Sequence, residues 1–262
     1  MPIGPARMPL FDHLGELRRR LTIIVVTMLV TVMVMYFATP VVIDILKDPI
    51  ARFLPTGGFI VTGALGGFTI KFNVAFKVAF VMCTPLIMWQ IMGFFLPALR
   101  EKERRWFTPT VFSAVMLFYL GALFCYFAIL PATFGFLVEE SASIGTVMPE
   151  AVDFINIELL LMIGFGVAFE LPLIVFYLAV FHIVPYTTFR EAWRYIYVIL
   201  LVISGVVTPD ASPVTMICLY AAMMLLYEGA LAVTRIVILK REGKQGLSYG
   251  RISLFDDDDE EE

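Results

Sequence analysis

Six apolar stretches alternate with charged segments along the chain. A helix needs about 20 apolar residues to cross a hydrocarbon core of about 30 Å, and most of these stretches approach that length. The pattern therefore predicts an all-α membrane protein with six transmembrane helices. The expected spans are residues 21–38, 72–93, 107–130, 159–181, 195–207 and 214–234.

Three of the spans are expected to stop at a proline or to be short. The third is expected to end at Pro131, because proline disrupts a helix interior. The fifth would be a short helix of about 20 Å. The sixth is also expected to be short, because Glu228 interrupts it. Either the bilayer thins beside these two helices, or neighbouring protein buries their polar ends.

Composition and charge agree with a membrane protein. The 262 residues are 60% hydrophobic and 16% charged, and the mean hydropathy is +0.88, so lipid is expected to surround the chain. Basic residues concentrate in alternate segments, and by the positive-inside rule both termini are predicted to be cytoplasmic. These residues are Arg7, Arg18, Arg19, Arg20, Arg100, Lys102, Arg104, Arg105, Arg190, Arg194, Arg235, Lys240, Arg241, Lys244 and Arg251.

Several classes of ligand are not expected. The net charge of −4 comes from an acidic tail, and residues 236–262 are predicted to be cytoplasmic and disordered. No broad basic face or nucleic-acid motif is present, so no nucleic acid is expected as a partner. His13 and His182 show no metal-ligand spacing. We expect neither a metal nor a cofactor.

The segment before the first span is amphipathic. Leu10, Leu14, Leu17 and Leu21 would share one face of a helix, and the charged side chains would lie toward the other. We expect an N-terminal amphipathic helix at the cytoplasmic surface. A basic anchor that only sets topology is the alternative, but it gives no reason for Glu16. Glu16 and Arg20 are four residues apart, so they can pair on one helical turn.

Two ionisable residues lie inside the predicted spans. Glu170 is near the middle of the fourth, and acidic groups at that depth usually have a function. It is expected either to contact a partner or to be a packing residue bonded to a neighbouring helix. Pro172 frees a backbone carbonyl and is expected to bend the helix. Lys77, in the second span, is expected to snorkel or to pair with Glu170.

Five motifs occur in order along the chain. They are HLGELRRRL before the first span, FFLPALREKERR after the second, YFAILPATFGFL after the third, FGVAFELP in the fourth and TPD after the fifth. Together, over roughly residues 10–235, they resemble the TatC family, the core receptor of the twin-arginine protein translocase. The resemblance implies one membrane domain over residues 1–235, with a cupped, concave bundle. It also implies a bacterial or archaeal cytoplasmic (inner) membrane.

The same resemblance implies roles for particular residues. A cytoplasmic site for signal peptides with two consecutive arginines would involve Glu16, Glu103, Arg18, Arg20, Phe94 and Pro97. Two carboxylates beside a low-dielectric surface would suit the planar donor fork of arginine. A solvated turn with local salt bridges is the simpler interpretation of the loop that holds Glu103.

The resemblance also implies partners inside and outside the membrane. Glu170 and Pro172 would meet single-span TatA/TatB-type subunits within an oligomeric complex. Asp210 and Pro49 match positions at the outer side. Asp210 is also suited to be the N-cap of the sixth span, and the two roles are compatible. Transport would draw on the proton-motive force.

Two other functions fit the sequence less well. A proton-coupled carrier of a small solute could use Glu170 and Lys77 as a relay, but it gives no reason for Glu16 and Glu103. An intramembrane serine protease would need a Gly-x-Ser-x-Gly motif, which is missing around Ser204. We do not expect an enzyme.

Overall fold

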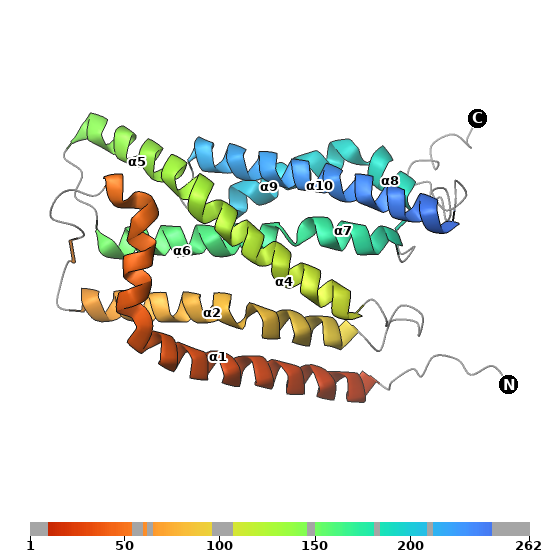
Figure 1. Cartoon of the computed structure of the whole chain (residues 1–262), viewed down its shortest axis with the longest axis horizontal. Helices are drawn as coiled ribbons and strands as arrows, with labels where there is room; N and C mark the ends of the chain where they lie inside the picture. The colour runs from red at the N-terminus through yellow and green to blue at the C-terminus, as the bar shows by residue number, and fades with distance from the viewer. Residues whose placement is uncertain are drawn as a thin grey trace, which may run out of the picture.

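The computed structural model describes residues 10–53, 60–61, 65–95, 107–145, 150–180, 184–208 and 212–242. These residues are almost entirely helical, and the start of α1 and the end of α10 lie at the same end of an elongated bundle (Figure 1). The helices are α1 (Leu10–Lys47), α2 (Gly66–Phe95), α4 (Phe107–Phe124), α5 (Leu130–Ile144), α6 (Ala151–Ala168), α7 (Leu171–Val180), α8 (Tyr186–Glu191), α9 (Trp193–Val207) and α10 (Pro213–Glu242). Two further helical segments are the 3-10 helix η1 (Asp48–Phe53) and the π-helix η3 (Cys125–Ile129).

The predicted all-α membrane architecture is confirmed for these residues. Five helical stretches are long and apolar enough to cross a membrane, and α9 is a shorter apolar helix. The five stretches are Leu14–Ala51, Gly66–Phe94, Phe107–Ser143, Ala151–Val180 and Pro213–Lys240. Each of the six predicted spans coincides with one of these helices.

The amphipathic segment and the first span form one helix, α1, of 38 residues. Nothing interrupts the backbone between the segment and the span, so the segment forms the first turns of α1. After Pro40, which lacks an amide proton and bends the helix, α1 turns across the bundle and continues into η1 (Figure 1). This arm is anchored by Ile50, whose side chain is fully buried in the core.

The prediction that the third span ends at Pro131 is wrong. The helix runs on from α4 through η3 into α5, and ends at Ile144. The amide of Leu130 donates to the carbonyl of Cys125, five residues back, so the turn before the proline is wide. A wide turn accommodates the proline ring, and the helix continues instead of stopping.

The helix is interrupted just before Pro172, where a bend is expected. Helix α6 ends at Ala168, a turn contains Phe169 and Glu170, and α7 begins at Leu171. The Glu170 amide donates to the Val167 carbonyl, three residues back, at 3.1 Å. Pro172 has no amide for the carbonyl of Ala168, so the regular ladder cannot cross this point.

The expectation of a short helix holds for α9, which has 15 residues, but not for α10, which has 30. Glu228 does not interrupt α10 because its carboxylate is bonded to side chains of α8 and α9. The helix includes residues 236–242, which were predicted to belong to a disordered tail. Residues 243–262 lie outside the described residues.

Ser212 occupies the N-cap of α10. Its Oγ accepts a hydrogen bond from the Thr215 amide at 3.2 Å. Pro213 is the first residue of the helix, a position where the amide has no acceptor within the helix and its absence costs nothing. The expected N-cap role of Asp210 is therefore wrong. Residue 210 itself lies outside the described residues.

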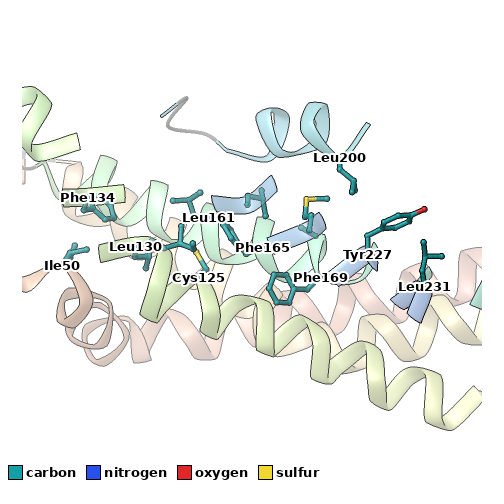
Figure 2. Close-up of a cluster of buried hydrophobic side chains, with 14 residues drawn as sticks. Ile50, Cys125, Leu130, Phe134, Leu161, Phe165, Phe169, Leu200, Tyr227 and Leu231 are labelled. Atoms are coloured by element: carbon teal, nitrogen blue, oxygen red, sulfur yellow. The ribbon is translucent and has the colours of Figure 1, made fainter. Parts of the chain in front are cut away.

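The core runs along the bundle between α5, α6, α9 and α10, with the bent end of α1 beside it (Figure 2). Two glycines let α4 and α6 approach closely. A Cβ at Gly121 would lie 2.6 Å from the Phe165 carbonyl, and one at Gly166 would lie 2.7 Å from the Phe118 ring. Membrane helices commonly pack through such small residues.

Candidate functional site

Glu16 and Arg20 form the predicted pair on the first turns of α1. The Arg20 Nε donates to Glu16 Oε1 at 3.0 Å, and Nη2 donates to the same oxygen at 2.6 Å. Both side chains are about three-quarters shielded from solvent. Because both bonds end on Oε1, the Oε2 atom stays open among the described residues. Arg20 thus holds the carboxylate in one orientation.

Arg20 also joins α1 to the end of α2. Its Nη1 donates to the side-chain oxygen of Gln90 at 3.2 Å and lies 3.4 Å from the Gln90 carbonyl. A Cβ at Gly93 would overlap this guanidinium. Gln90 and Gly93 are three residues apart on one helix face, and neither was singled out from the sequence. Their role depends on the contact between α1 and α2, which hydropathy does not reveal.

The same end of the bundle holds the start of α4. The rings of Trp89 and Phe107 pack edge to face, with centroids 4.9 Å apart, so the end of α2 lies beside the start of α4. Phe94 is half-buried in the last turn of α2, while Arg18 is exposed on α1. Pro97 and Glu103 belong to the connection between α2 and α4 and lie outside the described residues. We call this end the basic end; it holds the start of α1, the end of α2, α8 and the end of α10 (Figure 1).

Glu170 lies in the break between α6 and α7. One carboxylate oxygen, Oε1, is buried and has no hydrogen-bond partner among the described residues. Pro172, two residues on, is buried. The Glu170 carboxyl group thus lies in a helix break, with one buried oxygen unmatched among the described residues.

Lys77 does not pair with Glu170, so that alternative is wrong. Its ammonium contacts the side-chain oxygen of Asn156 and lies 3.5 Å from the Asn156 carbonyl. Asn156 precedes Glu170 by 14 residues, which is about 21 Å along a helix. The Glu170–Lys77 relay that the carrier alternative needs is therefore not formed.

Glu158 is a buried acid that the sequence analysis missed. Its side chain is fully buried in α6, and neither carboxylate oxygen has a partner among the described residues. The predicted fourth span began at residue 159, one position too late to include it. The pattern of Ala151, Ile155 and Leu159, all buried at helical spacing, was the signal that could have extended the span.

A second cluster that the sequence analysis missed joins α8, α9 and α10 at the basic end. Arg190 Nη1 donates to Glu228 Oε2 at 2.9 Å, and the Tyr197 hydroxyl donates to Oε1 at 2.7 Å. Along the sequence, Arg190 contributes only to the positive-inside pattern, and Glu228 is expected to interrupt the sixth span. The two are 38 residues apart, and only the packing of α8 against α10 brings them together.

The opposite end of the bundle holds Pro49, which is half-buried in η1 beside the buried Ile50. No group of His, Cys, Asp and Glu in the described part of the chain could hold a metal ion.

Apolar helices of membrane length, with polar groups at their ends and breaks, define a multi-pass helical membrane protein. Residues 12–221 match the family model described as "Sec-independent protein translocase protein (TatC)". The chain belongs to the TatC family, whose members are components of a protein translocase.

Two relatives and one solved structure illustrate the similarity. The TatC protein of Deinococcus radiodurans is 33% identical, over 88% of this chain and 87% of its own. That of Aquifex aeolicus is 31% identical, over 90% of this chain and 98% of its own. A crystal structure titled "Twin Arginine Translocase Receptor- TatC" superposes with a TM-score of 0.74 at 29% identity, and covers 86% of this chain and 98% of that one.

Proposed function

We propose that this chain is the receptor subunit of a twin-arginine translocase and binds the signal peptides of folded proteins at its basic end. The observation that carries the proposal is the Glu16 carboxylate, which Arg20 holds against the end of α2. Family membership and the likeness to a solved twin-arginine translocase receptor support it. The basic end would face the cytoplasm of a bacterial or archaeal cell.

Recognition would begin with an exchange of partners at Glu16. An incoming guanidinium can approach the open Oε2 and then compete with Arg20 for Oε1. Arginine presents paired donors to a carboxylate, whereas lysine presents a compact point charge, so the site would discriminate between them. Glu103 would receive the second arginine. Arg18, Phe94 and Pro97 would line the same surface.

Partner subunits would bind inside the membrane. Glu170 lies in the break beside Pro172 and is half-buried, and one of its oxygens has no partner among the described residues. Its carboxyl group would turn toward a TatA/TatB-type single-span helix and offer it an acceptor or a proton. Asp210 and Pro49 would act at the outer side. The assembled, oligomeric complex would use the proton-motive force, and this chain would catalyse no reaction itself.

Binding of a twin-arginine signal peptide to the purified chain tests the receptor proposal. A charge-assisted hydrogen bond contributes about 1.5–3 kcal/mol, so Glu16→Ala or Glu103→Ala should weaken binding roughly ten- to a hundredfold. Glu139→Ala is the matched control, because Glu139 is exposed on α5 at the opposite end of the bundle. Unchanged affinity in a folded Glu16→Ala, Glu103→Ala double variant would overturn the proposal.

Co-purification with a single-span partner tests the role of Glu170 separately. Glu170→Ala should reduce the amount of partner that is retained, while binding of the signal peptide stays unchanged. Full retention of the partner by Glu170→Ala would remove Glu170 from the interface.

A further inference from the structure

The Arg190–Glu228 ion pair lines two hollows at the basic end. One, of about 400 Å³, lies along α10 and is lined by Arg190, Glu228, Arg235 and apolar side chains. The other, of about 460 Å³, is lined by Arg190, Glu228, Trp193 and Tyr197. The ion pair is therefore part of the lining of both hollows.

The hollow along α10 has both charged and apolar lining. Arg235 contributes a guanidinium, and Leu231, Ile236 and Leu239 contribute apolar surface from the same stretch of α10. Residues 228, 232, 235 and 239 recur at helical spacing, so one face of the helix carries both kinds of group. Such a surface suits an amphiphile better than a free ion.

The charge balance of this hollow favours an anion. The negative charge of Glu228 is matched by Arg190 and by the Tyr197 hydroxyl. Arg235 is exposed and has no ion pair among the described residues. A second cation lies near the other hollow, where the Arg194 guanidinium is 5.4 Å from the centroid of the Trp193 ring. The uncompensated charge at this place is positive.

The position along the bundle fits a lipid headgroup. Trp193 and Tyr195 are exposed at the start of α9, and aromatic side chains of this kind gather where a membrane meets water. Guanidinium groups bind phosphate through paired donors, and basic pockets between membrane helices bind anionic headgroups.

We infer that the hollow lined by Arg190 and Arg235 binds one anionic phospholipid, with its phosphate on Arg235 and an acyl chain on the apolar face of α10. The site is separate from Glu16 and from Glu170, so it does not depend on the proposed receptor function.

Native mass spectrometry of the full chain in neutral detergent tests this inference. The probes are dioctanoyl phosphatidylglycerol and dioctanoyl phosphatidylcholine, whose choline cation offsets its phosphate. The unmodified protein should retain more phosphatidylglycerol, and Arg235→Gln should lower that affinity about tenfold, through loss of one charge-assisted contact. Arg235→Lys should restore part of the preference, because lysine also binds phosphate as a point charge.

Lys240→Gln is the matched control, because it removes one exposed positive charge from the same helix but does not line the hollow. It should leave the affinity unchanged. Equal losses in Arg235→Gln and Lys240→Gln would overturn the site in favour of diffuse surface charge, as would equal retention of the two lipids. Displacement of phosphatidylglycerol by an equal concentration of glycerol 3-phosphate would overturn the lipid assignment and indicate a soluble phosphate ligand.

Discussion

The Arg20 guanidinium donates to the Gln90 side-chain oxygen at 3.2 Å, and this bond joins the first turns of α1 to the last turns of α2. The same guanidinium holds Glu16. The orientation of the Glu16 carboxylate, which is proposed to bind the signal peptide, therefore depends on the packing of α2 against α1 as well as on α1 itself.

Substitution at Gly93 should disturb this arrangement without unfolding the protein. In Gly93→Ala the new methyl group would overlap the Arg20 guanidinium, which must then move away from Gln90 and Glu16. We expect the affinity for a twin-arginine peptide to fall roughly tenfold, the equivalent of about 1.4 kcal/mol, as measured by titration calorimetry. Gly67→Ala, on the same helix with open space around its Cβ, is the control and should bind normally. Normal binding by Gly93→Ala would show that peptide binding does not require the Arg20 guanidinium to stay bonded to Glu16 and Gln90.

The crossing of α4 and α6 should tolerate no added methyl group. Gly121→Ala would place its Cβ 2.6 Å from the Phe165 carbonyl, which is backbone and cannot move aside. Overpacking of this kind lowers the free energy of unfolding by about 1–3 kcal/mol. Thermal unfolding in detergent should show a lower midpoint for Gly121→Ala. Gly229→Ala, in open space on α10, should be neutral or slightly stabilising, because alanine favours a helix. Equal midpoints for the two variants would contradict the close crossing.

Glu158 should be dispensable for stability. Its two carboxylate oxygens are buried without partners in the described residues, and an apolar side chain of similar shape avoids that desolvation penalty of about 1–3 kcal/mol. Glu158→Met should therefore unfold at the same temperature as the unmodified protein or higher. Glu228→Met is the comparison and should unfold at a lower temperature, because it leaves Arg190 and Tyr197 without their acceptor. A clear loss of stability in Glu158→Met would mean that the carboxyl group has a partner.

The Lys77–Asn156 contact should behave as a coupled pair. Asn156→Leu would leave the Lys77 ammonium with only the more distant backbone carbonyl, at 3.5 Å, inside a membrane span. Lys77→Met should relieve part of that destabilisation. In a double-mutant cycle of unfolding free energies we expect a coupling of about 0.5–3 kcal/mol, the range seen for residues in contact. Additive effects would show that the two side chains act independently.

The positions of the membrane helices could be predicted because apolar length alone indicates a span. The bends could be predicted only in part. Pro172 breaks its helix as expected, whereas Pro131 does not, because the π-helical turn at Cys125–Ile129 accommodates its ring. Whether the turn before a proline can widen depends on tertiary packing. The presence of a proline in the sequence does not reveal that packing.

The candidate sites could be predicted where the partners are near each other in sequence. Glu16 and Arg20 lie on adjacent turns of one helix, so their spacing was sufficient. Lys77 and Asn156 are 79 residues apart, and both are polar residues in apolar surroundings with many possible partners. Their pairing depends on how α2 packs against α6, and no pattern along a single helix contains that information.

The preference for arginine over lysine tests the central proposal most directly. We would measure the affinities of a twin-arginine signal peptide and of its twin-lysine version for the unmodified chain and for Glu16→Gln. The unmodified chain should bind the twin-arginine peptide at least tenfold more tightly than the twin-lysine peptide. Glu16→Gln should remove most of this preference, because a neutral amide does not form the paired, charge-assisted hydrogen bonds that a carboxylate forms with a guanidinium. An equal ratio in both proteins would contradict recognition at Glu16, and no preference in either would contradict the receptor function itself.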